Sequence, residues 1–273
     1  MNVRELTRSG QKKLTQVGIN SAQLDSEILL SWSLSKTREW LIAHSLDELA
    51  QSQANLFNGL IARRLEHEPI CYITNRIEFY GLDFYVDDRV LCPRAETELI
   101  VEQAIKRAPL NSSLIDLGTG SGAIAIAIAY HRKDLTITAT EISSKALVVA
   151  KRNAEYILGQ NNNIKFIKSN IWDDINGKFD TIVTNLPYVS TSYTPNMEPE
   201  VKKEPAIAIF GGGKDGLSLY RKFYDGMPSH TNPKTIVFHE SDPWQHDKLK
   251  KLASQASLSL LFEDYLILGF SKK

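Results

Sequence analysis

The chain has 273 residues, a length that suits one large domain or two of ordinary size. Hydrophobic residues make up 42% and charged residues 23%, which indicates a soluble globular protein able to bury a substantial core. Lys and Arg number 32, as do Asp and Glu, so the formal net charge is zero. Because proteins that bind a phosphate backbone usually carry a basic excess, strong direct binding to nucleic acid is not expected.

Targeting signals and metal-ligand patterns are missing from the sequence. Residues 1–6 lack the apolar core of a signal peptide, and the longest apolar stretch, 123–130, is too short to cross a bilayer. Cys71 and Cys92 have no CxxC spacing, so we expect reduced, inert thiols. No histidine has the spacing of a metal ligand. We therefore expect a cytoplasmic protein with no metal and no membrane contact.

Residues 1–75 have the apolar spacing of helices. Leu24, Ile28 and Leu29 recur at helical intervals, as do Leu56 and Leu60, which predicts a small helical bundle. The next segment, 76–92, is aromatic and rich in residues that favour strands, with a turn at Gly81, so we interpret it as a β-hairpin linker. A helix is then predicted to start at Cys92-Pro93-Arg94 and to run to about residue 104.

From residue 113 onward, predicted strands alternate with predicted helices. The strands are expected at 114–117, 136–140, 164–168, 179–184 and 235–240, with helices at 123–131 and 145–157 and a closing hairpin at 258–262 and 266–270. Such alternation predicts an α/β fold with a mostly parallel, doubly wound sheet.

A glycine-rich loop follows the first of these strands and opens a helix. It reads Asp116-Leu117-Gly118-Thr119-Gly120-Ser121-Gly122. Glycines permit positive φ and close approach of a ligand to the backbone, and a helix N-terminus offers unpaired N–H groups. The loop is therefore a candidate site for a pyrophosphate or for the methionine carboxylate of S-adenosylmethionine.

An acidic residue stands where a nucleotide ribose would be bound. Glu141 ends the second predicted strand of the sheet, 21 positions beyond Gly120 and close to the spacing of about 20 residues in nucleotide-binding folds. Together with the glycine loop it favours an adenosine-containing ligand. It does not distinguish NAD from S-adenosylmethionine.

The tetrapeptide Asn185-Leu186-Pro187-Tyr188 distinguishes the two ligands. It follows the fourth predicted strand of the sheet, at the edge where open α/β sheets bind ligands. The Asn185 side-chain oxygen and the Leu186 carbonyl can accept both N–H bonds of an amide or amine nitrogen. Pro187 stiffens the turn, and the Tyr188 ring can lie flat against a planar group. This chemistry suits methyl transfer to nitrogen, where positioning supplies most of the acceleration.

Several further motifs occur in a characteristic order along most of the chain. They are 24–30, Arg63-Arg64, Glu68-Pro69-Ile70, Tyr72-Ile73, 93–98, 116–123, 185–189, Glu204-Pro205 and 212–217. With these motifs the sequence resembles the HemK/PrmC family, the peptide chain release factor glutamine methyltransferases. The resemblance implies a class I S-adenosylmethionine-dependent methyltransferase, which is a Rossmann-like sheet with a C-terminal antiparallel hairpin, preceded by a small helical bundle.

The resemblance also assigns domains, ligands and a partner. It implies a helical substrate-binding domain at 1–75, the hairpin linker at 76–92 and the methyltransferase domain at 93–273. S-adenosylmethionine, with S-adenosylhomocysteine as product, would be held by Asp116, Gly118 to Gly122, Glu141, Asn170, Ile171 and Asn185. Residues 185–188 would hold the substrate glutamine, which lies in the Gly-Gly-Gln motif of release factors. We expect the protein to be a monomer.

Two related activities remain open at this point. The family usually has Pro where this chain has Leu186, and Asn-Leu-Pro-Tyr also resembles the ribosomal RNA adenine dimethyltransferases. Methylation of an adenine amine on RNA or DNA is therefore an alternative, although the zero net charge argues against it. Methylation of a glutamine on a ribosomal protein is a second alternative.

Overall fold

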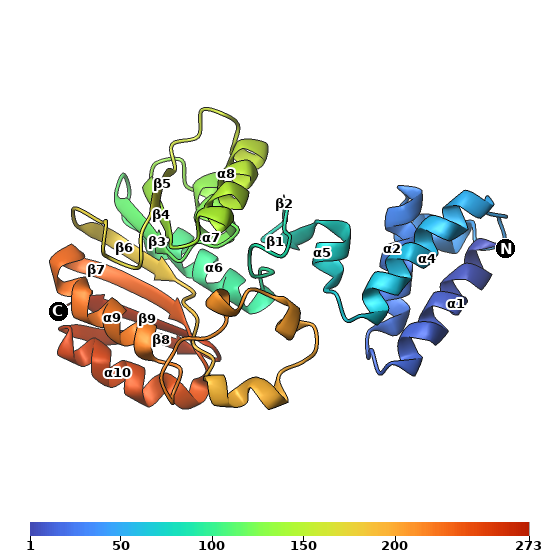
Figure 1. Cartoon of the computed structure of the whole chain (residues 1–273). Helices are drawn as coiled ribbons and strands as arrows, with labels where there is room; N and C mark the ends of the chain where they lie inside the picture. Colours follow the sequence, from blue (N-terminus) through green and yellow to red (C-terminus); the bar gives the residue numbers. More distant parts are fainter. Residues whose placement is uncertain (273) are drawn as a thin grey trace. The chain divides into compact units, whose positions relative to one another are not determined.

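The computed structural model describes residues 1–272, and the chain divides into two compact units. The first unit consists of Met1–Asn75 and Glu198–Lys203, and the second consists of Arg76–Met197 and the residues from Glu204 onward. Figure 1 labels most of their helices and strands and colours the chain from the N-terminus to the C-terminus.

The first unit is built from helices. They are α1 (Val3–Gln16), α2 (Ala22–Leu34), α3 (Arg38–Ala43), α4 (Gln51–Leu65) and α5 (Ile70–Thr74). The short 3-10 helix η3 (Val201–Lys203) also belongs to this unit. The start of α1 is fixed by a capping box, in which the Asn2 side chain accepts from the Glu5 N–H and Glu5 accepts from the Asn2 N–H. Leu14, Leu29 and Phe57 are fully buried in the common core. The helical character predicted for this region is confirmed.

A buried ion pair ties a distant segment into this helical unit. The Arg64 side chain donates from Nε to Asp25 at 2.7 Å and from Nη2 to Glu200 at 2.7 Å. Arg64 and Asp25 are each 4% exposed, so the cost of burying each charge is offset by the opposite charge beside it. Residues 198–203 have no apolar periodicity that would place them with the helices, and the sequence did not reveal this contact.

The second unit begins with a hairpin and a helix. Strands β1 (Ile77–Phe79) and β2 (Leu82–Phe84) pair antiparallel, as predicted. The following helix starts with the 3-10 turn η1 (Ala95–Thr97) and continues as α6 (Glu98–Arg107). It therefore begins at Ala95 and not at Cys92. Pro93 disfavours helical geometry in the residue before it, and Arg94 is still extended at φ −105°.

A seven-stranded sheet forms the centre of the second unit, in the order β5-β4-β3-β6-β7-β9-β8. Its strands are β3 (Ser113–Leu117), β4 (Thr136–Glu141), β5 (Lys165–Lys168), β6 (Phe179–Thr184), β7 (Thr231–Glu240), β8 (Leu258–Asp264) and β9 (Ile267–Lys272). Strands β3 to β7 pair in parallel, whereas β9 is antiparallel to both β7 and β8. The predicted methyltransferase fold with a C-terminal antiparallel hairpin is confirmed.

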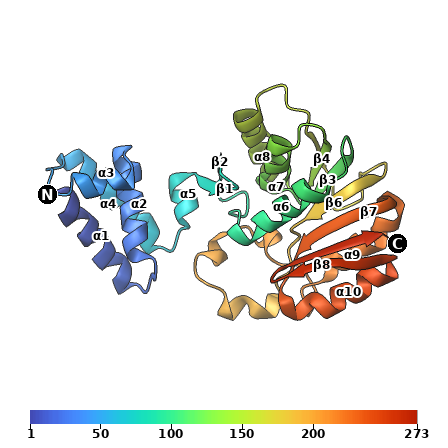
Figure 2. The same cartoon turned by 180° about the vertical axis from the view of Figure 1, so that it is seen from behind.

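Helices cover both faces of this sheet, as Figures 1 and 2 show from opposite sides. Besides α6, they are α7 (Ala123–His131), α8 (Ser144–Leu158), α9 (Ser218–Gly226) and α10 (His246–Gln255). Short 3-10 helices occur as well: η2 (Thr191–Asn196), η4 (Ala206–Ala208), η5 (Met227–His230) and η6 (Pro243–Gln245). Alternate strand residues face opposite sides. Leu114 packs with α6 and α7, whereas Ile115 packs in a second core with α9 and α10.

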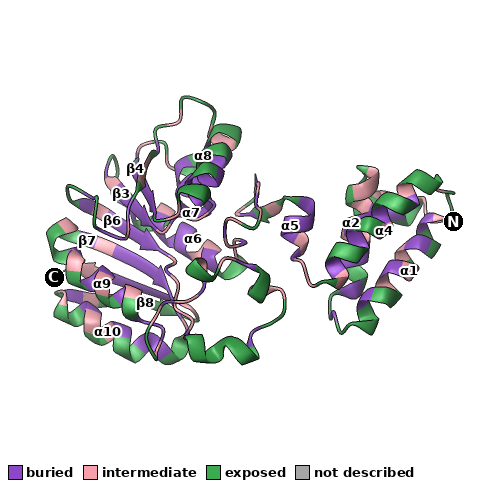
Figure 3. Cartoon of the chain, viewed as in Figure 1, coloured by how far each residue is buried: buried purple, intermediate pink, exposed green. Residues whose placement is uncertain are grey.

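The central strands are almost wholly buried between these two layers, as the purple ribbon in Figure 3 shows. Within residues 1–272, no helix is long and apolar enough to cross a membrane. Neither Cys71 nor Cys92 is a free thiol, so the prediction of reduced cysteines is wrong. Spacing in a sequence does not show whether a cysteine is a free thiol.

Candidate active site

The glycine loop forms the turn between β3 and α7. Gly118, Gly120 and Gly122 have φ values of +73°, +56° and +85°, a region that side chains rarely adopt. A Cβ added to Gly120 would meet no atom within 4 Å, whereas one added to Gly118 would lie 3.2 Å from Leu186 Cδ2. The loop therefore offers bare backbone on one side and approaches the tetrapeptide 185–188 on the other.

Glu141 closes the loop from the end of β4. Its carboxylate accepts from the Gly120 N–H at 3.0 Å and from the Ser143 N–H at 2.9 Å. Burial raises the pKa of Glu141, and these backbone hydrogen bonds oppose the rise because they favour the charged form. An acidic group is thus held in a fixed orientation at the carboxyl end of two neighbouring parallel strands.

Asp116 lies beneath the loop. It is fully buried, and one of its oxygens accepts from the Thr119 hydroxyl at 2.6 Å while the other has no hydrogen-bond partner. Burial raises the pKa of Asp116 to about 7. It holds the loop from below and is not among the residues that line the cavity.

The raised pKa of Asp116 makes the stability of the protein depend on pH. Between pH 4 and 7 the unfolded chain ionises this carboxyl, whereas the folded protein keeps it neutral, so the stabilising contribution present below pH 4 is lost as pH rises to 7. The loss amounts to at most about 4 kcal/mol. We expect Asp116→Asn to remove this slope from the free energy of unfolding, measured by denaturant titration at several pH values. Parallel pH profiles for the variant and the wild type would contradict this assignment.

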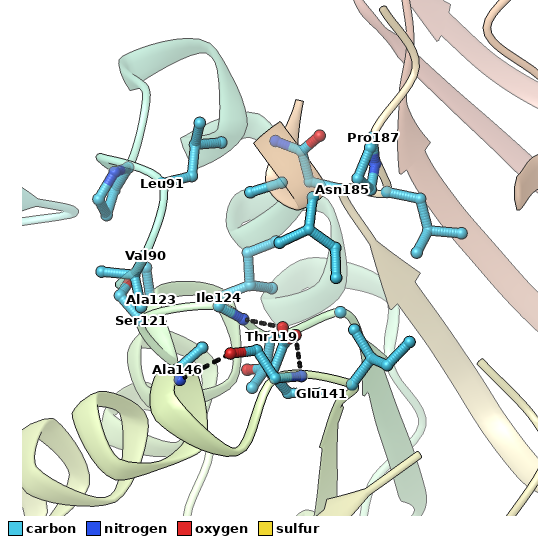
Figure 4. A pocket seen from close by; sticks show the side chains of 18 of the residues that line it. Val90, Leu91, Thr119, Ser121, Ala123, Ile124, Glu141, Ala146, Asn185 and Pro187 are labelled. Atoms are coloured by element: carbon cyan, nitrogen blue, oxygen red, sulfur yellow. Dashed lines mark hydrogen bonds between the residues drawn. The ribbon is translucent and has the colours of Figure 1, made fainter. Parts of the chain in front are cut away.

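A cavity lies above the loop and is lined by most of the residues predicted from sequence. They are Gly118, Thr119, Gly120, Ser121, Glu141, Asn170, Ile171, Asn185, Leu186 and Pro187. Figure 4 shows Asn185 and Pro187 at one end and Glu141 at the other. Asp116, Gly122 and Tyr188 were also predicted and are not among the lining residues. The carboxyl ends of β3, β4 and β6 therefore bring the loop, the acidic residue and the tetrapeptide to one site.

The tetrapeptide is held by contacts at both ends. The Asn185 Nδ2 group donates to the Thr97 hydroxyl at 3.1 Å. The Tyr188 hydroxyl donates to Glu240 at 3.0 Å, and burial together with this negative neighbour raises the pKa of Tyr188. Leu186 is 4% exposed and packs into the core beside α9. The turn is therefore anchored without any proline at position 186.

A second glycine turn presses against the backbone of the tetrapeptide. A Cβ added to Gly211 would lie 2.3 Å from the Pro187 carbonyl oxygen, and one added to Gly216 would lie 2.0 Å from the Tyr188 carbonyl oxygen. The Gln245 side chain also donates to the Tyr188 carbonyl at 2.9 Å. Gly211 and the family-like run 212–217 that follows it thus support the backbone of residues 187 and 188.

Sequence reasoning missed several residues of this site. Thr97, Val90, Leu91, Ile207 and Ala208 line the cavity, and Glu240 lies behind it. In the sequence, only the family-like motifs at 93–98 and 204–205 indicated that residues near these positions belong to the site. The structure explains that signal, because Arg94 donates to Glu204 at 2.7 Å and the Glu204 side chain is 1% exposed.

Comparison with known proteins identifies relatives of this chain. A family model described as the PrmC N-terminal domain matches residues 5–74, and one described as the methyltransferase small domain matches residues 95–201. The release factor glutamine methyltransferase of Moorella thermoacetica is 36% identical over 93% of this chain and 90% of its own length. The enzyme of the same name from Geobacter sulfurreducens is 36% identical over 81% of this chain and 77% of its own.

A solved structure shares the fold. The structure of a methyltransferase from Pyrococcus furiosus aligns with a TM-score of 0.54 at 22% identity, over 77% of this chain and 96% of that one. At that identity the likeness concerns the arrangement of strands and helices alone.

Proposed function

Because the chain belongs to the release factor glutamine methyltransferase family, we propose that it methylates the side-chain amide nitrogen of a glutamine with S-adenosylmethionine as methyl donor. The proposed target is the glutamine of the Gly-Gly-Gln motif in peptide chain release factors. The observation that carries the proposal is the 36% identity to the release factor glutamine methyltransferase of Moorella thermoacetica over 93% of the chain.

The cavity has groups that suit S-adenosylmethionine, which when bound supplies an electrophilic methyl group on a sulfonium sulfur. The open space at Gly120 and the positive-φ glycines leave room for the methionine carboxylate at the loop. Glu141 is placed to accept from ribose hydroxyls, and the Asn170 side-chain oxygen can accept from the adenine amine. Asp116 and Gly122 shape the loop from outside the cavity surface.

We assign the substrate amide to Asn185 and Leu186. The side-chain oxygen of Asn185 and the backbone carbonyl of Leu186 accept the two N–H bonds, which aims the nitrogen lone pair at the donor. Pro187 keeps the turn stiff, and Tyr188 secures it through Glu240. Among the described residues that line the cavity there is no histidine or cysteine. Little base catalysis is required, since an amide nitrogen becomes acidic only as it is alkylated.

We further propose that the helical domain, residues 1–75, helps to bind the release factor, and that the hairpin 76–92 links it to the methyltransferase domain 93–273. The model for the PrmC N-terminal domain, matched over residues 5–74, supports a distinct role for this region. We propose a monomer that acts in the cytoplasm, where its substrate functions.

Radiolabelled S-adenosylmethionine tests this proposal against its two alternatives. The purified protein is incubated separately with a release factor, with ribosomal proteins and with RNA. We expect label on the release factor alone, and none when the Gly-Gly-Gln glutamine is replaced by alanine. Label on RNA would instead support methylation of an adenine amine. Label on a ribosomal protein would support methylation of a glutamine on that protein.

A further inference from the structure

A buried carboxylate stands behind the cavity wall at Asn185. Glu240 is the last residue of β7, next to β6 in the sheet, and is 2% exposed. It does not line the cavity, whereas Thr97 and Asn185 do. A charged group in this position is costly to bury unless its hydrogen bonds are satisfied, so its partners indicate what it does.

The hydrogen bonds to Glu240 come from the cavity wall. The Thr97 hydroxyl donates to one oxygen at 2.5 Å, and the Tyr188 hydroxyl donates to the other at 3.0 Å. Burial raises the pKa of Glu240, while hydrogen bonds from Thr97, Tyr188 and the Asn185 side chain oppose that rise. One carboxylate therefore holds both ends of the tetrapeptide, directly at Tyr188 and mainly through Thr97 at Asn185.

The Thr97 hydroxyl transmits this constraint because it has only one proton. With that proton given to Glu240, Thr97 can offer only its lone pairs to Asn185, and it accepts from the Asn185 Nδ2 group at 3.1 Å. If the Asn185 amide were rotated by half a turn, so that its oxygen and NH2 group exchanged places, the oxygen would face the Thr97 lone pairs and receive no hydrogen bond. The observed orientation leaves the Asn185 oxygen available to the cavity.

We propose that Glu240, acting through Thr97, is a positioning residue that fixes the Asn185 side chain with its amide oxygen toward the substrate. The inference rests on the proposed function, in which Asn185 accepts an N–H bond from the substrate amide. An inverted Asn185 would present its own NH2 group to the NH2 group of the substrate, so that two donors would face each other and the nitrogen would lose its orientation.

Glu240→Gln tests this with little change in shape. The introduced glutamine has one acceptor and one donor end, so its NH2 group must face either Thr97 or Tyr188. A Thr97 hydroxyl that accepts from this NH2 group keeps its proton free for Asn185 and permits the inverted amide. We expect kcat on a release factor to fall about 10- to 100-fold, with the Kd for S-adenosylmethionine and the Tm of the protein little changed.

Thr97 supplies a matched pair of variants. Thr97→Val removes the hydroxyl at similar volume and is expected to lower kcat as much as Glu240→Gln, while Thr97→Ser keeps the hydroxyl and is expected to lower it far less. The double variant Glu240→Gln, Thr97→Val should lose clearly less kcat than the product of the two single losses, because both residues belong to one hydrogen-bond network that ends at the Asn185 side chain.

The outcomes separate this inference from the proposed function. Wild-type kcat in Glu240→Gln, or losses that multiply in the double variant, would overturn the positioning role while leaving the methyltransferase assignment intact. Equal losses of kcat in Thr97→Val and Thr97→Ser would also overturn the positioning role, because the two variants differ in whether they keep the hydroxyl. A wild-type protein that transfers no methyl group to the release factor would overturn both.

Discussion

Asn185→Ala is expected to lower kcat for release factor methylation by about three orders of magnitude while the protein still binds S-adenosylmethionine. The asparagine side-chain oxygen is one of the two acceptors proposed to hold the substrate amide, and its loss leaves the nitrogen free to rotate away from the donor. Glu141 and the glycine loop, at the other end of the cavity, remain in place to bind the cofactor.

Steady-state kinetics and a titration of the cofactor by calorimetry measure the two quantities separately. Asn162→Ala is the matched control, because Asn162 donates only within its own turn, to the Gly159 carbonyl at 2.9 Å, and is absent from the cavity lining. Unchanged turnover in Asn185→Ala would remove Asn185 from the mechanism. A variant that lost cofactor binding to the same extent would show that Asn185 serves the cofactor instead.

Arg64→Ala is expected to cost the helical unit about 3–5 kcal/mol of local stability. The substitution leaves Asp25 buried at 4% exposure without its cation and removes the hydrogen bond that holds Glu200 to the same unit. Because a buried, uncompensated carboxylate is so costly, the loss should far exceed that of an exposed ion pair. Hydrogen exchange of the amides in α2 and α4 measures this free energy directly.

The neighbouring arginine provides the control for this experiment. Arg63 pairs with Glu68, but its side chain is 45% exposed, so Arg63→Ala should cost no more than about 1 kcal/mol. Replacing Asp25 and Arg64 together by Leu and Met should recover much of the loss, since neither buried charge of that pair remains. An Arg64→Ala variant with the exchange rates of Arg63→Ala would contradict the account.

Much of the fold was predictable because its signals are local. The alternation of apolar strands with helices gave the parallel sheet, and the run 116–122 combined a strand end, three glycines and a helix start within a few residues. The cap of α8 is local in the same way, since the Ser143 hydroxyl accepts from the Ala146 N–H three residues away.

The parts that were missed depend on contacts between distant residues. Thr97 and Glu240 are separated by 143 positions, and neither belongs to a pattern that marks it as a partner of Asn185. Glu200 reaches Arg64 across 136 positions. The position of β9 between β7 and β8 could not be predicted either, because a hairpin pattern in the sequence does not show which of its two strands pairs with the rest of the sheet.

The position of the transferred methyl group tests the central claim most directly. A release factor is incubated with the protein and S-adenosylmethionine that has an isotopically heavy methyl group, then digested and sequenced by tandem mass spectrometry. The account predicts one heavy methyl group on the side-chain amide nitrogen of the Gly-Gly-Gln glutamine, and almost none with Asn185→Ala. A release factor that gained no methyl group, or gained it on another residue, would contradict the account.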